Sequence, residues 1–239
     1  MAGRASRRSW RWEAAQAGSL LLMYLMISPF LVHSVEIVAA GLGGEPAGKP
    51  YLFVQADLFG NSAMVVHATA GVILTALVPL QLVGVVRRNM TMLHRAMGVL
   101  LLGCTLFASV GGLAYIAIRG TVGGPVMSIG FALYGLCLLF AAARLFQTAM
   151  EGDRPGHWRW SLRFFWLAIG SWLYRLHYVL WYLATGGIWS TPDFTGAFDR
   201  VQNFAFYIPY LFLVQVWIAR RAQFRTCPPD AATEALPQP

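Results

Sequence analysis

The chain has 239 residues, of which 57% are hydrophobic and 12% are charged, and its formal net charge is +8. This composition excludes an ordinary soluble domain and a disordered chain. Five or six stretches are apolar for about 20 residues or more, which is the length that crosses the hydrocarbon core of a bilayer. Only helices and closed barrels satisfy their backbone groups in lipid, and runs this long favour helices. The composition therefore predicts an all-α, polytopic membrane protein.

In chain order, the predicted spans are residues 18–40, 62–86, 96–118, 123–149, 161–186 and 204–222. The Arg7-Arg8 pair before the first span resembles an export signal, but the apolar run is too long for a signal core and favours a retained helix. Residues 1–17 are expected to be an N-terminal tail, and residues 223–239, rich in Pro and Ala, a disordered C-terminal tail. Residues 18–222 are expected to form one six-helix bundle.

The lysine and arginine residues are unevenly distributed over the predicted loops. Fourteen of the 18 lie in the two tails, in the loop between spans 2 and 3, or around the loop between spans 4 and 5. These four regions share one side of the membrane, whereas Lys49, Arg119 and Arg200 lie on the other side. Because cytoplasmic loops carry the excess of positive charge, both termini are predicted to be cytoplasmic. The net charge is thus a topology signal, and no nucleic-acid partner is expected.

All five histidines lie inside an apolar segment or at its edge, where an imidazole needs a partner. At about 1.5 Å of rise per residue, His67 lies roughly 7 Å below the outer end of its span, His33 roughly 10 Å and His177 roughly 13 Å. His94 and His157 lie at the inner face. The chain therefore has an outer tier of three histidines and an inner tier of two.

Two facing histidines at one depth are what a bis-imidazole haem requires as axial ligands. Gly71 and Gly98, each one turn after a histidine, would let the macrocycle approach the helix. A plainer role stays open, in which each histidine bridges two helices through a hydrogen bond or relays a proton. The candidate pairs for haem b are His67 with His177, or with His33 as a substitute, in the outer tier, and His94 with His157 in the inner tier.

Arg175 lies about a dozen residues from either end of the fifth span, where an unpaired arginine costs several kcal/mol. Glu36 is the only acidic side chain within a span, so a haem propionate, an anionic headgroup and a substrate carboxylate are alternative partners. On the same span, Tyr174, Tyr178 and Tyr182 recur every four residues and form one stripe. Such a stripe is either packing or the lining of a quinone or macrocycle pocket.

The stretch from His67 to Arg175 carries short motifs in a fixed order. They are His67, Pro79-Leu80-Gln81, His94-Arg95 with Gly98, Gly130-Phe131, Gly152-Asp153, His157 with Trp160 and Arg163, and Arg175. This set resembles a bacterial family of predicted membrane proteins catalogued as domain of unknown function 2306. The resemblance implies a multi-span protein of the bacterial inner membrane with no assigned reaction.

The chain departs from that family at several positions. The aromatic-basic-Trp-Met run of the family ends here in Ser161. Tyr210 and Gln215 stand where the last span of the family tends to carry Asn and Glu, and His33 and His177 lie outside the pattern. The layout of histidines at two depths is also loosely similar to that of six-span di-haem cytochromes b of the ascorbate-reducing type, which is a likeness of layout only.

Three functions stay open from the sequence. The first is a haem b protein that passes electrons across or within the membrane to a quinone or redox partner, with Arg175 on a propionate or on the quinone. The second is a transporter of a small anion or a proton-coupled substrate, with His67, Arg175 and His177 as its polar site. The third is a scaffold whose polar residues only fix helix packing. The three cysteines contain no CxxC pair, which argues against a thiol redox motif.

Overall fold

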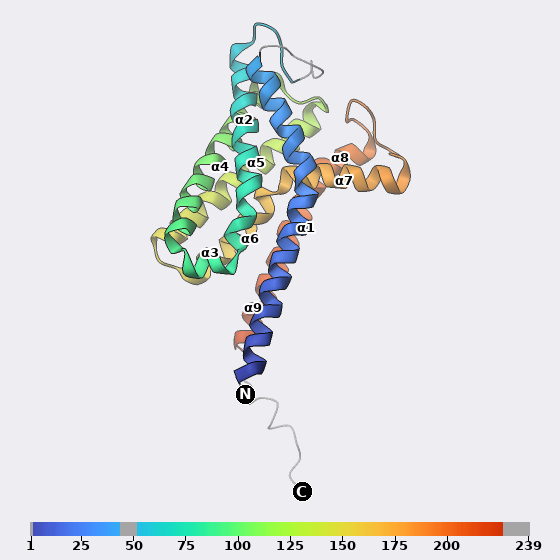
Figure 1. The fold of residues 1–239 in the computed structure, drawn as a ribbon. Helices are drawn as coiled ribbons and strands as arrows, with labels where there is room; N and C mark the ends of the chain where they lie inside the picture. The colour runs from blue at the N-terminus through green and yellow to red at the C-terminus, as the bar shows by residue number, and fades with distance from the viewer. Residues whose placement is uncertain (1, 44–51, 227–239) are drawn as a thin grey trace.

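The computed structural model describes residues 2–43 and 52–226, which form helices with no strand among them (Figure 1). The elements are α1 (Ala2–Gly43), α2 (Leu58–Leu77), the 3₁₀ helix η1 (Val78–Leu82), α3 (Gly84–Asn89), α4 (Thr91–Arg119), α5 (Gly124–Met150), α6 (Arg154–Ala168), α7 (Gly170–Thr185), α8 (Ala197–Ala205) and α9 (Ile208–Thr226).

Five stretches of the described chain are long and apolar enough to cross a membrane. They are Ala14–Gly43, Leu58–Leu82, Thr91–Arg119, Gly124–Met150 and Ala197–Arg221. The prediction of an all-helical chain with several membrane-spanning helices is therefore confirmed. The fifth predicted span, 161–186, is not among the five, so the count of six spans is not established.

The bundle is built from neighbouring antiparallel helices. Helix α2 packs against both α1 and α4, and α5 packs against α4 and α6. The start of α1, the short helix α3, the turn between α5 and α6 and the end of α9 all lie at one end of the molecule, which is the lower end in Figure 1. These are the segments that carry most of the basic residues, so the predicted grouping of charge corresponds to one end of the fold.

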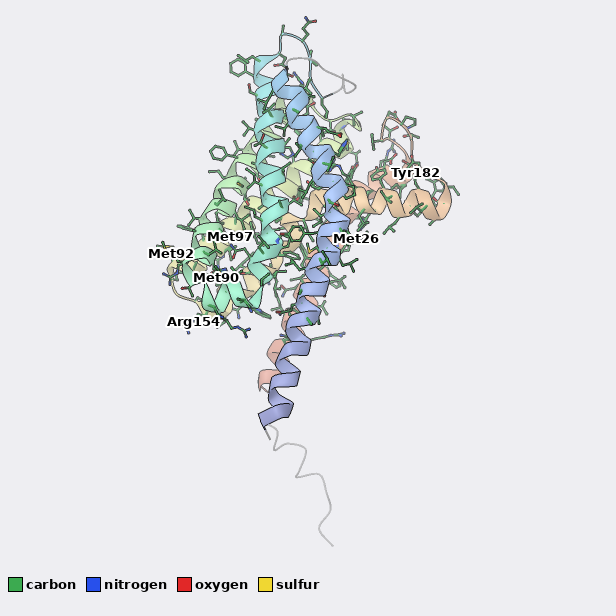
Figure 2. All side chains as sticks on the ribbon, viewed as in Figure 1. Met26, Met90, Met92, Met97, Arg154 and Tyr182 are labelled. Carbon is green, nitrogen blue, oxygen red and sulfur yellow. The ribbon has the colours of Figure 1, made fainter. Side chains whose placement is uncertain are left out.

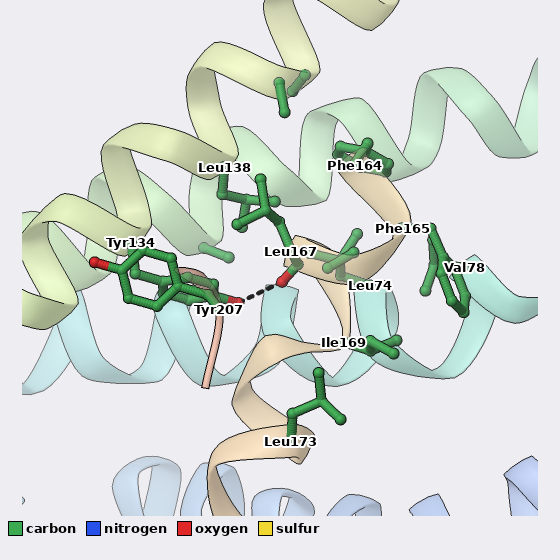
Figure 3. Close-up of a cluster of buried hydrophobic side chains, with 14 of the residues drawn as sticks. Leu74, Val78, Tyr134, Leu138, Phe164, Phe165, Leu167, Ile169, Leu173 and Tyr207 are labelled. Carbon is green, nitrogen blue, oxygen red and sulfur yellow. Dashed lines mark hydrogen bonds between the residues drawn. The ribbon is translucent and has the colours of Figure 1, made fainter. Parts of the chain in front are cut away.

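The segment predicted as one helix over 161–186 is broken in two. Helix α6 ends at Ala168, Ile169 has φ −90° and ψ 2°, and α7 then projects to one side of the bundle (Figure 1). The hydroxyl of Tyr134 on α5 donates a hydrogen bond of 2.6 Å to the carbonyl of Leu167 at this break (dashed line in Figure 3). A Cβ at Gly170 would lie 2.8 Å from the Tyr134 ring, so a glycine is what lets the ring reach the break.

The break lies in the most tightly packed part of the core. Phe206 and Tyr207, which separate α8 from α9, are 0% and 1% exposed. The ring of Tyr134 lies 4.9 Å from that of Phe206 and 5.5 Å from that of Tyr207. The apolar stretch Ala197–Arg221 is thus made of two helices, of which α8 packs against α7 and α9 packs against α6, and the last predicted span, 204–222, corresponds mainly to α9.

Both predicted tails differ from the expectation where the structure describes them. Helix α1 begins at Ala2, so residues 2–17 continue the first span as helix. Residues 223–226 belong to α9. The predicted disorder of the remaining residues, 227–239, lies outside the described residues, as does the part of the first outer loop at 44–51.

An ion pair fixes the other end of the bundle. Asp57 caps α2 by accepting from the backbone N–H of Gly60 at 2.9 Å, and it accepts from Arg119 Nε at the end of α4 at 2.6 Å. Arg119 also donates to the carbonyl of Leu52 and to the side chain of Asn61, each at 2.8 Å. The Gly60 N–H and the Arg119 guanidinium hold the pKa of the Asp57 carboxyl below its usual value of 3.8.

Acid should weaken this end of the fold. Because the pKa of Asp57 is depressed in the folded state, its stabilising effect is present above the unfolded pKa and is lost as the pH falls through the folded value. We expect the unfolding temperature in detergent to fall as the pH is lowered from about 5 to about 3. In Asp57→Asn the unfolding temperature should fall less over the same pH range. An equal pH dependence in both proteins would show that Asp57 contributes nothing to it.

Removing the hydroxyl that satisfies the helix break should destabilise the bundle. In Tyr134→Phe the buried Leu167 carbonyl loses its partner, which we expect to cost about 1–2 kcal/mol in the free energy of unfolding. The matched control is Tyr182→Phe, because the Tyr182 side chain is exposed and should change stability by less than about 0.5 kcal/mol. Equal free energies of unfolding in the two variants would contradict the proposed role of the hydrogen bond from Tyr134.

Candidate functional site

The motif residues around Gln81, His94 and His157 come from three elements that meet at the basic end of the bundle. Pro79 ends α2 and starts η1, and Gln81 on η1 donates from Nε2 to the backbone carbonyl of His94 at 3.2 Å. Figure 2 shows Met90, Met92 and Met97 at the start of α4 and Arg154 at the start of α6 at this same end. The starts of α4 and α6 therefore bring one histidine each to this end.

A tight turn positions His157. Gly152 has φ +71°, and the Asp153 carboxylate then folds over the start of α6 to accept from the N–H of Gly156 at 2.9 Å. A Cβ at Gly156 would lie 1.9 Å from that carboxylate, so both glycines are needed for the turn. The backbone N–H of His157 donates to the Asp153 carbonyl at 2.8 Å, and its Nδ1 faces the Leu145 carbonyl at 3.4 Å.

The inner histidine site carries polar atoms that the protein leaves without a partner. His94 lies near enough to His157 for the charge of one imidazole to act on the other, and Arg87 and Arg95 act on His94 as well. His94 Nδ1 and Gln81 Oε1 are both buried and accept or donate no hydrogen bond. Buried polar groups in proteins are nearly always paired, so these atoms are available to a ligand.

Two glycines leave space beside the histidine-bearing helices. Nothing lies within 4 Å of the position that a Cβ would take at Gly98, one turn after His94. The same holds at Gly71, one turn after His67. The helix surface at each of these two glycines is therefore open to a group of at least the size of a methyl.

His67 joins two helices. Its Nδ1 lies 2.6 Å from the carbonyl of Ala108 on α4, so Nδ1 carries the proton and donates. Gly111 and Gly112 make room for the ring, since a Cβ at Gly112 would lie 2.7 Å from His67 Nδ1. Nε2 is then the unprotonated nitrogen, and metal-binding histidines often have this arrangement, with one ring N–H donating to a backbone carbonyl and the other nitrogen free to bind the metal.

His177 is engaged elsewhere. Its Nε2 lies 2.7 Å from the Tyr210 hydroxyl, and its Nδ1 lies 3.0 Å from Gln202 Nε2. His177 therefore faces α8 and α9, whereas His67 faces α4. His33, the predicted substitute, lies 3.9 Å from Glu36 on its own helix.

A buried carboxylate between α7 and α8 is the functional-looking residue that the sequence did not single out. Asp199 is 0% exposed and accepts from the Tyr178 hydroxyl at 2.7 Å and from the Ser190 hydroxyl at 2.8 Å. It also accepts from the backbone N–H groups of Thr191 and Gly196 at 2.9 and 3.0 Å. The sequence contained one indication of this role. Asp199 is the third residue of the helix that follows Gly196, and an acidic residue at this position often caps the start of a helix.

Two amides share α8 with Asp199. Gln202 is 3% exposed and donates to the Tyr174 carbonyl at 3.3 Å. Asn203 is 0% exposed, and neither atom of its amide has a hydrogen-bond partner. A Cβ at Gly130 would lie 2.6 Å from the Asn203 carbonyl oxygen, so this part of the family-like motif serves close packing of α5 against α8.

Arg175 and the tyrosine stripe are placed mainly by local contacts. Arg175 donates to the Ser171 carbonyl at 3.1 Å, and its guanidinium lies 4.8 Å from the ring centre of Phe30 on α1. Its charge acts on His67. Tyr174 donates to the Tyr178 hydroxyl at 3.3 Å, so two of the three stripe residues join the Asp199 network.

Comparisons with known proteins do not assign the chain to a family. No family model, no curated protein and no solved structure matches the chain. Within the described residues, no group of three or more His, Cys, Asp or Glu side chains is placed to hold a metal ion by itself. The resemblance drawn from the motifs and the predicted ligand pairs therefore stay predictions.

Removing the Asp199 carboxylate should unfold the hairpin between α7 and α8. Asp199→Ala leaves several buried donors without an acceptor, and we expect it to lower the free energy of unfolding by about 3 kcal/mol or more. Asp193→Asn is the matched control, because Asp193 is exposed in the same loop and should cost less than about 0.5 kcal/mol. Similar losses in both variants would show that the network is not what holds the hairpin.

Proposed function

We propose that this chain is a bacterial inner-membrane protein that binds haem b at its basic end, with His94 and His157 as axial ligands, and passes single electrons. The observation that carries the proposal is the inner pair itself, in which two helices each supply one imidazole and His94 Nδ1 is buried without a partner. When bound, haem would supply the reversible one-electron change of its iron.

The neighbouring residues fit such a group. Gln81 Oε1 is a buried acceptor without a donor, and with haem bound it would accept a hydrogen bond from His94 Nδ1–H and so orient the ring for coordination. The open surface at Gly98 would admit the macrocycle. Arg87 and Arg95, whose charges act on His94, would neutralise the propionates.

The orientation in the membrane is part of the proposal. The basic end of the fold would face the cytoplasm, with both termini on that side. The histidine site would then lie near the cytoplasmic surface, within reach of a quinone or a soluble redox partner. The convergence of Gln81, His94 and His157 on one site also supports membership of the chain in the family that its motifs resemble.

A second haem in the outer tier does not enter the proposal. Both ring nitrogens of His177 already have partners in Gln202 and Tyr210, and coordination would break one of these bonds. His67 keeps an unprotonated Nε2, but its ring faces α4, whereas His177 faces α8 and α9. One haem at the inner site is therefore the stoichiometry that the side chains favour.

A transporter is the second candidate, and one observation favours it. Asn203 is buried with both amide atoms unpaired, beside the chain of hydrogen bonds that runs from Tyr210 through His177 to Gln202. Such a group would take up a proton-coupled or small polar solute. Proteoliposomes that accumulate a substrate only under a proton gradient, and lose this in Asn203→Leu, would favour the transporter over the haem protein.

The absorption spectrum of the purified full chain tests the haem proposal. We expect a Soret band and reduced α and β bands of a six-coordinate haem, with about one haem per chain, and loss of the bound haem in His94→Ala and in His157→Ala. Gln81→Ala should keep the spectrum but weaken haem binding about tenfold, because it removes only the orienting acceptor.

His33→Ala and His177→Gln serve as controls and should retain the full haem content. A wild-type protein without a Soret band after expression with added haem would overturn the proposal. So would an unchanged spectrum in both His94→Ala and His157→Ala.

A further inference from the structure

The inner ends of α6 and α9 carry a cluster of tryptophan and arginine side chains that the histidine site does not use. The rings of Trp158 on α6 and Trp217 on α9 lie 5.4 Å apart. The Arg221 guanidinium lies 4.2 Å from the centre of the Trp217 ring and 6.0 Å from that of Trp158. The guanidinium thus lies against an aromatic surface, in a position where a cation is attracted by the rings.

A second arginine, Arg163, also joins α6 to α9. Arg163 on α6 donates to the side chain of Gln215 on α9 and lies 4.7 Å from the ring centre of Trp160. This bond joins the two helices at Gln215, six residues before Arg221 on α9. The surface formed by Trp158, Trp217 and Arg221 therefore has a fixed shape.

The positive charge of this surface has no acidic counterpart in the described part of the chain. Among the described residues neither Arg154 nor Arg221 has a carboxylate within 4.0 Å, and the ion pair between Arg119 and Asp57 lies at the opposite end. The nearest acidic residues in sequence are engaged, since Glu151 accepts from Gln147 at 2.7 Å and Asp153 caps α6. Fixed guanidinium groups without a carboxylate partner are suited to bind phosphate.

An apolar strip continues from the charged cluster toward the middle of the membrane. Leu213, Trp217 and Arg221 recur every four residues and share one face of α9. Leu213 is 61% exposed and Trp217 is 41% exposed. On α6, Arg154 and Trp158 are spaced in the same way. Each helix thus has an arginine near the basic end of the bundle and a tryptophan one turn further from that end. Helix α9 also has an aliphatic side chain, Leu213, one turn beyond its tryptophan.

We infer that this surface is a binding site for an anionic phospholipid. The phosphate and the headgroup lie between Arg221 and Arg154, the two tryptophans lie at the level of the glycerol, and an acyl chain lies along Leu213. Basic pockets between membrane helices on the side of the positive residues bind anionic headgroups, and tryptophan is the residue preferred at this depth. The order of charge, aromatic ring and aliphatic side chain matches a phospholipid better than a free phosphate ion, which would use only the end of the helices.

Native mass spectrometry of the full-length protein tests this site by titration with phosphatidylglycerol and with phosphatidylcholine. We expect the wild type to prefer phosphatidylglycerol at least fivefold, Arg221→Gln to lower that affinity about fivefold, and Arg154→Gln to do the same from the other helix. Arg88→Gln is the matched control, because Arg88 is an exposed arginine at the same end on α3 and should leave the affinity unchanged.

Both variants alter exposed side chains, so their thermal unfolding and their haem content should match those of the wild type. Equal retention of the two lipids by the wild type would overturn the inference. So would an equal loss in Arg88→Gln, which would show a general effect of positive charge and no defined site.

Discussion

The hydrogen bond from Tyr134 to the carbonyl of Leu167 is the constraint on which the two polar sites depend. A helix can break inside a membrane only where the freed backbone groups find partners, because an unpaired carbonyl there costs several kcal/mol. With the break satisfied, α6 stays in the bundle and keeps His157 near His94 on α4. Helix α7 is then free to leave the bundle and carry His177 to α8 and α9. The consecutive helices α6 and α7 thus supply one histidine to each of two separate sites.

Much of the fold was predictable, and the break shows why some was not. The four long helices α1, α2, α4 and α5 follow from apolar length alone, and the grouping of basic residues follows from the distribution of charge. Local sequence gives a poor account of kinks, since Pro79 ends α2 whereas Pro29 lies inside the continuous helix α1. Nothing at Ile169 signals a break, because its cause, Tyr134, lies 33 residues before the carbonyl that it satisfies. Such a partner is fixed by packing and is not visible in a local pattern.

The same reasoning separates the histidine pairs. The inner pair was predicted from depth, and the two residues lie near each other because both start helices at one end of the bundle. Depth also suggested His67 with His177, but depth says nothing about the direction in which each helix faces. His67 faces α4, and His177 faces α8 and α9. Asp199 was missed for a related reason, since the acid is visible in the sequence whereas its donors come from the folded loop before it.

The two sites differ in which groups the protein leaves without a partner. The Asp199 carboxylate receives at least four hydrogen bonds and contributes to the stability of the hairpin, whereas the amide of Asn203 on the same helix has no partner. At the inner site, Gln81 Oε1 and His94 Nδ1 remain unpaired, and each such buried atom costs about 1–3 kcal/mol. The chain could remove that cost with apolar side chains of similar shape. Retaining an imidazole and an amide there makes physical sense when a ligand engages them, and this is the reason for proposing the haem at the inner site, where two histidines also lie near each other.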